Sequence, residues 1–416
     1  MATLRMHACG CAALTLLFAP VSLAGQQTIR LPARDRILAE KPEVLYAVGA
    51  EQGEDWQLLS GVRGVAFDAS DNLYVLDSNN FRVLIFDVTG KFLRRISRQG
   101  EGPGELMSPT GMTVMADGTV VVSDGGRRAY SLFNSDGTFV RDVSYGVGEG
   151  VGSRMEGLRS HPSRGVVTQI QPLRARGSEG SAAGERKVRL TWLDLSATDS
   201  PATVLYAFTM PPIAPRVDEL PGRGVSITTV PPNWTPALTF GVLPNGGLSV
   251  ADDADYRVKV VSPAGKVERI IERPIAPRRG TPKDKEAFIK REAENLMQGV
   301  PQSRRTDRGS GAASGAGPTL AMIEELVRNA TWLDVIPVLR RVSADPQGRI
   351  WVARTPDDFA VSGAVDILRA DGAYIGTIPD ATVPGAVSKT GRAAFITRDE
   401  LGVERVTVKR LPANWQ

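Results

Sequence analysis

The chain has 416 residues, of which 42% are hydrophobic and 23% charged, so it can form a core and is not disordered or collagen-like. Lys and Arg number 50 against 46 Asp and Glu, and the net charge of +4 argues against a dedicated polyanion binder. Two Cys and two His exclude a Cys-rich zinc or disulfide framework. The 43 Gly and 28 Pro predict many tight turns.

The first 24 residues have the pattern of a signal peptide. A short start with one charge, Arg5, is followed by an apolar run over Ala8–Ala19 and by small residues before Gly25. We expect cleavage after Ala24, which leaves a mature chain with no cysteine and one histidine. The pattern predicts a periplasmic or secreted protein without an integral membrane segment, and a retained signal anchor is the alternative.

An internal repeat follows the signal sequence. Residues 64–94 and 111–141 align without a gap at an offset of 47, which places Asp77 on Asp124. Residues 241–269 and 342–377 form further copies, and two degenerate copies cover 155–210 and 391–411. Repetition at this spacing predicts one supersecondary unit stacked or arranged in a ring.

Each copy divides into four short strands. In the first copy, apolar runs at 65–67, 73–76, 83–86 and 92–96 are separated by turn residues. We therefore predict an all-β fold over residues 25–416, a six-bladed β-propeller of four-stranded antiparallel blades. A spare strand at Pro42–Val48 is expected to complete the last blade and close the ring.

Residues 278–335 interrupt the pattern before the fifth blade. Thr281 and Pro282, with Asp284 three residues after Thr281, predict a helix start, and a second helix is expected from Thr319 to about Asn329. The segment 302–318 between them is polar and Gly-rich, so it is expected to be a flexible linker. The helices could form a lid over the propeller or only cover an apolar patch.

Several motifs resemble the NHL repeats of exported bacterial six-bladed propellers. The segment RQGEGPGELMSPTGMTV, at 98–114, is similar to the connector between blades in those proteins, and DSNNFR, at 77–82, is similar to their strand–turn–strand signature. The resemblance implies the fold. It implies no single activity, because the family's fold carries sensors, scaffolds, lyases and lactonases.

Charged residues recur where strands leave for turns. Asp77, Asp124 and Asp252 are each expected to accept turn N–H bonds, and an Arg follows two of them after five residues. A ring of polar groups that faces a ligand is the alternative, and paired arginines are candidates for anionic groups. The candidate binding residues are Arg82, Arg128, Asp252, Asp253, Arg257 and Arg341.

No catalytic or metal-ligating residue is predicted. A lone His161 cannot make a multi-His zinc site, and no Gly-x-Ser-x-Gly elbow accompanies it, so we expect His161→Ala to leave stability and activity nearly unchanged. A Ca²⁺ ion is possible at Asp252-Asp253 with Asp255, or in the central funnel, although the loop lacks the later Glu of an EF-hand.

The sequence favours an exported binding or scaffold module over an enzyme. We predict that it recognises a peptide, glycan or protein partner on one face of the ring, and no nucleic acid. The alternative is a metal-dependent hydrolase, lactonase or lyase with a carboxylate site in the central funnel.

Overall fold

The computed structural model describes residues 26–145, 154–171, 186–196, 201–210, 216–220, 224–228, 232–298, 319–359, 361–399 and 401–415. The signal peptide expected at 1–24 and the linker expected at 302–318 lie outside the described residues.

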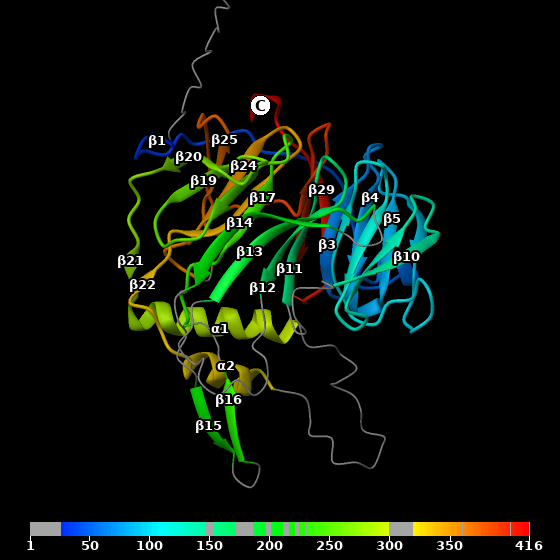
Figure 1. Cartoon of the computed structure of the whole chain (residues 1–416), viewed down its shortest axis with the longest axis horizontal. Coiled ribbons are helices and arrows are strands. Elements are labelled where there is room, and N and C mark those ends of the chain that lie inside the picture. Colours follow the sequence, from blue (N-terminus) through cyan, green and yellow to red (C-terminus); the bar gives the residue numbers. More distant parts are fainter. Residues whose placement is uncertain are drawn as a thin grey trace, which may run out of the picture.

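The described strands form the six blades of a β-propeller (Figure 1). From the axis outward, blade 1 contains β3 (Val62–Phe67), β4 (Leu73–Asp77), β5 (Arg82–Phe86) and β6 (Phe92–Ile96). Blade 2 contains β7 (Pro109–Val114), β8 (Val120–Asp124), β9 (Ala129–Phe133) and β10 (Phe139–Ser144). Blade 3 contains β11 (Arg154–Ser160), β12 (Val166–Gln171), β13 (Arg186–Leu193) and β14 (Ala202–Met210).

The other three blades follow the same order. Blade 4 contains β17 (Thr239–Val242), β18 (Leu248–Ala251), β19 (Arg257–Val261) and β20 (Val267–Glu272). Blade 5 contains β23 (Leu339–Ala344), β24 (Arg349–Arg354), β25 (Val365–Arg369) and β26 (Tyr374–Ile378). Blade 6 contains β27 (Ala386–Val387), β28 (Arg392–Arg398), β29 (Glu404–Arg410) and β2 (Glu43–Val48). The predicted fold class is confirmed.

The hydrophobic core lies between neighbouring blades. Every residue of the middle strands β4, β5, β8 and β9 is buried, because both faces of each sheet pack on an adjacent blade. Between blades 1 and 2, Tyr74 and Ile85 pack with Met112, Val120 and Phe133 in one cluster. The outer strand β6 instead alternates between exposed and less exposed residues, as expected for a strand at the rim.

The N-terminal segment joins three blades along their outer edges. The strand β2 pairs antiparallel with β29, so Pro42–Val48 lies where the sequence led us to expect it. A preceding strand, β1 (Gln27–Arg30), adds to blade 4 in parallel with β20 and makes that blade five-stranded. Between them, Ile37 bridges Thr377 at the outer edge of blade 5. We call residues 26–48 the N-terminal strap.

Two helices follow blade 4. The short strands β21 (Arg278–Arg279) and β22 (Val335–Ile336) pair with each other and close the base of an insertion that contains α1 (Pro282–Gln298) and α2 (Leu320–Arg328). The helices pack on each other through Ile289, Ala293, Ile323 and Val327. In Figure 1 they lie below the ring, next to a hairpin of β15 (Arg216–Leu220) and β16 (Gly224–Thr228). None of the described helices is long and apolar enough to cross a membrane.

Candidate functional site

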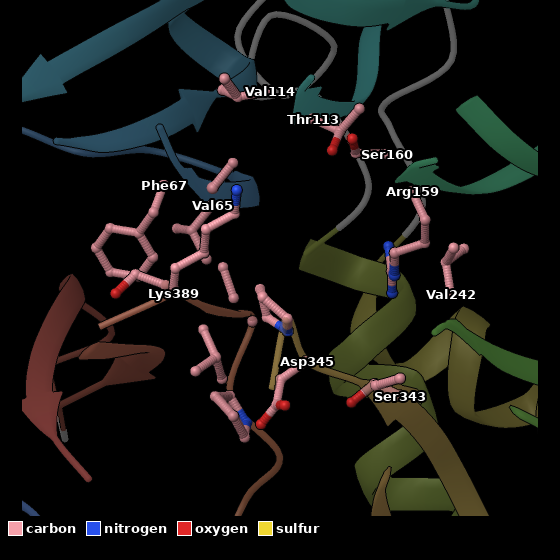
Figure 2. Close-up of a pocket in the computed structure, with 18 of the residues that line it drawn as sticks. Val65, Phe67, Thr113, Val114, Arg159, Ser160, Val242, Ser343, Asp345 and Lys389 are labelled. Carbon is pink, nitrogen blue, oxygen red and sulfur yellow. The ribbon is translucent and has the colours of Figure 1, made fainter. Parts of the chain in front are cut away.

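A cavity of about 480 Å³ lies on the axis of the ring, where the innermost strands of all six blades face one another. Its lining residues come from 65–69, 112–116, 158–162, 242–244, 341–346 and 384–389, with Trp351 of β24. Most of them belong to the innermost strands and to the turns that follow, whereas Pro384 and Gly385 precede β27. Figure 2 shows Phe67 and Lys389 on one side of the cavity and Arg159 on the other. Small-ligand pockets typically measure about 300–1,000 Å³.

Two arginines from different blades border this cavity. Arg159 comes from β11 and Arg341 from β23. Arg159 donates to the carbonyl of Leu158 over 2.9 Å, and neither guanidinium is paired with a carboxylate of the described residues. Burial, and then the charge of Arg341, lower the pKa of Arg159 to about 10, and burial also lowers the pKa of Arg341. Both side chains are protonated at neutral pH, so the cavity has a positively charged end.

These depressed pKa values have a thermodynamic consequence. A cation with a lower pKa in the folded state than in the unfolded state disfavours folding at every pH below the folded value. At neutral pH the folded protein therefore bears a cost for burying the charge of Arg159, to which the charge of Arg341 adds. An anion between the two guanidinium groups would remove much of this cost, because it would bind only the folded state.

The helix α1 lies near the arginine end of the cavity. The positive charge of Arg340, which precedes Arg341 in β23, adds to burial in lowering the pKa of Arg291 on α1 to about 10. Glu292, also on α1, partly offsets the effect of burial on Arg340. Arg291 donates to the carbonyl of Phe359 over 3.4 Å and stacks on the Phe359 ring at 4.6 Å.

Arg82 of the predicted set lies in an internal ion pair. Its Nε donates to Asp77 over 2.8 Å, and its other nitrogens donate to Asp55 and to the carbonyl of Leu58. The carboxylate of Asp77 also accepts the N–H of Ser60 just before β3. Asp124 repeats this arrangement in blade 2 with the N–H groups of the residues before β7. In blades 1 and 2 the repeated Asp therefore ties the blade to the connector that enters it.

The blade 4 candidates also have internal partners. Asp252 is buried and accepts from Lys259 over 2.6 Å and from the Tyr206 hydroxyl over 2.5 Å. The expectation that Asp252 accepts turn N–H groups is therefore wrong, because among the described residues its hydrogen-bond donors are these two side chains. Arg257 pairs with Asp253 at 3.0 Å and with Glu272 at 3.1 Å.

Arg128 is exposed on the turn before β9 and has a positive φ of 55°. Of the six predicted binding residues, the structure brings only Arg341 to the cavity. A ligand contact at the other five stays a prediction.

His161 is built into the interface between blades 3 and 4. Its Nδ1 accepts the N–H of Ser163 over 3.2 Å, so its Nε2–H faces the carbonyl of Gly246 at 3.3 Å. The ring packs on Trp192 with centroids 5.1 Å apart, and burial lowers the pKa of the imidazole. These contacts contradict the expectation that this residue is dispensable for stability.

We expect His161→Ala to lower the free energy of unfolding by about 1–3 kcal/mol, because it removes a packed ring and leaves the Gly246 carbonyl unpaired. The native imidazole is neutral while the unfolded one takes up a proton, so the contribution of His161 is present above about pH 6.5 and declines below it. Urea unfolding of the wild type and His161→Ala at pH 8 and pH 5 tests this. An equal difference in free energy at both pH values would contradict the neutral, buried imidazole.

The described residues contain no group of three His, Cys, Asp or Glu side chains that could hold a metal ion. Asp252 and Asp253, which the sequence offered for Ca²⁺, are held by Lys259 and Arg257. Within the part of the chain described, the carboxylates at this position are therefore neutralised by basic side chains.

Comparison with known families agrees with the strand topology. A family model for DUF5128, described as a 6-bladed beta-propeller, matches residues 53–145, which contain blades 1 and 2. Sheet topology and this match together define the class of protein as a six-bladed β-propeller. No curated protein matches the sequence.

Solved structures show weak similarity to the chain. An exported protein of Bacteroides fragilis has 10% identity and a TM-score of 0.47, with 93% of this chain and 100% of that chain covered. A DUF4221 member from Bacteroides vulgatus has 13% identity and a TM-score of 0.46, with 91% and 98% covered. Virginiamycin B lyase from Staphylococcus aureus has 8% identity and a TM-score of 0.39, with 85% and 96% covered. The function of this chain must therefore be argued from its own residues.

Sequence reasoning reached Arg341 but missed Arg159. Arg340-Arg341 was conspicuous as an arginine pair, whereas Arg159 lies in a degenerate copy where the repeat gives no alignment. Arg159 could have been identified from its place in the strand. It follows Leu158 near the end of the first strand of its copy, where the innermost strands of the other copies also line the cavity.

Proposed function

We propose that this chain is an exported propeller of the NHL type that acts as a binding module and holds an anionic peptide or glycan in its axial cavity. The observation that carries the proposal is the pair Arg159 and Arg341, two guanidinium groups that border one cavity without a carboxylate partner among the described residues. A planar guanidinium matches a carboxylate or phosphate in bidentate geometry, so two of them favour an anionic group.

The assignment to the NHL type rests on the connector before blade 2. Its glycines Gly100 and Gly104 have φ values of +158° and +75°, and Glu105 folds back to accept the N–H of Gly102 over 2.9 Å. The glycines and the glutamate of the Gly-x-Gly-Pro-Gly-Glu motif thus stabilise the turns of this connector. Export rests on the signal-peptide pattern of residues 1–24.

Binding accounts for the cavity better than hydrolysis assisted by histidine. The cavity is bordered by Ser160 and Ser343, whose hydroxyls would need a base to act as nucleophiles. The imidazole of His161 instead lies between Ser163 and Gly246 and is not among the lining residues. The described lining residues therefore supply charged groups around a concave cavity, and a binding site requires both.

We expect Arg341→Ala to weaken binding of an acidic ligand by about tenfold or more, the usual loss for a charge-assisted hydrogen bond. Isothermal titration with trigalacturonate and triglutamate measures this on the mature protein. The matched control is Arg128→Ala, which removes an exposed arginine outside the cavity. Equal affinities in the wild type and both variants, or no binding of either probe to the wild type, would overturn the proposal.

A further inference from the structure

Building on the proposed function, we infer that the cavity takes an organic anion with an apolar body, which enters with its anionic group first from the turn face of the ring. The turn face is the face formed by the turns that follow the innermost strands. The inference rests on the different chemistry of the two ends of the cavity and on the wall between them.

The turn face is the open end. The lining continues from the innermost strands into their turns at Ala69, Ala116, Pro162, Pro346 and Lys389. These residues belong to five different blades, so they surround the axis. Ala116 and Pro346 are exposed, as expected at a mouth in contact with solvent. The proline and alanine residues are rigid, apolar parts of the rim with little side-chain entropy to lose on binding, and Asp68, Asp345 and Lys389 are its charged parts.

The helix α1 is fixed near the other end. Arg278 holds Asp284 through two hydrogen bonds of 2.7 Å, and Thr281 and Asp284 cap the start of the helix reciprocally. The Arg278 guanidinium holds the pKa of Asp284 well below its usual range. These charge-assisted and capping hydrogen bonds anchor the first turn of α1 to the pair β21–β22.

Aromatic packing anchors the middle of α1. Phe288 meets Trp332 at 5.6 Å and Phe359 at 5.7 Å between ring centroids, and Trp234 meets Trp332 at 4.8 Å. Trp234 precedes blade 4 and Phe359 lies between β24 and β25 of blade 5. The helix is thereby packed onto two blades on the face away from the turns. A ligand would reach the arginines most directly from the turn face.

The side chains that line the cavity around the arginines are mainly apolar. They include Val65, Phe67, Met112, Val114, Met115, Leu158 and Val242. Phe67, Val65 and Val114 are visible around the cavity in Figure 2. Methionine and aliphatic side chains adapt to an apolar ligand, and each buried methylene of the ligand is expected to raise affinity by about threefold to fourfold. A strongly hydrated polyanion would still bind the two arginines but would gain no further affinity from this wall.

Arg341 lies in the first half of β23, and the charge of Arg159, which lies one residue before the end of β11, interacts with it. Two guanidinium groups that interact in this way complement a single carboxylate or phosphate group. The required ligand therefore has one anionic group and an apolar body, whether it is a free acid or the C-terminus of an apolar peptide. The shared chemistry is an end-on carboxylate, and the two sources differ only in the body attached to it.

The experiment compares octanoate, butyrate, 1-octanol and the tripeptide acetyl-Leu-Leu-Leu by isothermal titration against the mature protein. We expect octanoate to bind at least a hundredfold more tightly than butyrate, because four more methylenes are buried. We expect Arg341→Ala to reduce its affinity at least tenfold while 1-octanol is unaffected. Tripeptide affinity above that of octanoate would identify a peptide C-terminus as the source. The reverse order would identify a free acid.

The direction of insertion is tested with Ala116→Trp, which narrows the mouth without removing an arginine. We expect it to slow octanoate association at least tenfold, whereas Arg128→Trp on the outside of blade 2 has no effect. Octanoate no tighter than butyrate, together with trigalacturonate binding that depends on Arg341, would overturn this inference and leave the proposed function standing. Loss of the Arg341 dependence for every probe would overturn both.

Discussion

A mature chain that begins at Gly49, without the N-terminal strap, is expected not to fold into a closed ring. Removal of β2 leaves blade 6 without its outer strand and exposes β29 as an unpaired edge. The strap also brings Asp35 to the buried arginine Arg273 between blades 4 and 5. The summed loss is expected to exceed about 5 kcal/mol, which is comparable to the whole stability of many domains.

The measurement is circular dichroism combined with size-exclusion chromatography. The matched control begins at Pro32 and so lacks β1 but keeps Asp35 and β2. Blade 4 still has four strands in this control, so we expect a folded monomer with a lower melting temperature. A folded, cooperatively melting chain that begins at Gly49 would contradict the role assigned to ring closure.

Substitution of Arg273 is expected to produce the largest single-residue loss of stability. Its side chain is fully buried and pairs with Asp35 at 2.6 Å and with Asp366 at 3.1 Å. Asp366 also accepts the Tyr256 hydroxyl over 2.7 Å, and Arg354 pairs with Asp35 at 2.8 Å. The network thus joins the strap to blades 4 and 5.

Arg273→Ala would leave Asp366 buried with too little positive charge, and we expect a loss of about 3–5 kcal/mol in the free energy of unfolding. Arg257→Ala is the matched control, because Arg257 also pairs with two carboxylates but is about one-third exposed. We expect it to cost about 1 kcal/mol or less. Guanidinium unfolding of both variants checks the contrast. Similar losses would show that the buried network contributes no more than a surface pair.

The architecture could be predicted because the fold is repeated. The offset of 47 residues between the first two copies gave the strand pattern of blades 1 and 2, and Pro42–Val48 was assigned to the last blade because that blade lacked a strand. The helix start at Thr281–Asp284 could be predicted because the capping residues are close together in the sequence.

Features that depend on contacts between residues far apart in the sequence could not be predicted from the repeat. The parallel pairing of Gln27 with Arg269 joins segments more than two hundred residues apart, and no turn residue marks it. The network around Arg273 combines the strap with two blades, so its members have no common spacing. A repeat predicts only the features that recur in each copy. The N-terminal strap occurs once in the chain, so the repeat could not predict its contacts.

The candidate site was predicted only in part for the same physical reason. Asp77 and Asp124, which recur at the same blade position, bind backbone N–H groups, whereas Asp252 at this position binds Lys259 and Tyr206. Arg159 and Arg341, which contribute positive charge to the cavity, occupy non-equivalent places in two divergent copies. The candidate binding residues therefore lie where the copies differ in sequence, and the repeat pattern could not predict them.

The most direct test of the account is a crystal structure of the mature protein with 8-bromooctanoate, in which anomalous scattering locates the bromine. We expect the carboxylate between Arg159 and Arg341 and the bromine near the turn-face rim at Lys389. A bromine peak at the α1 end of the cavity would contradict the direction of insertion. A ligand bound only outside the axial cavity would contradict the central claim that the cavity is the binding site.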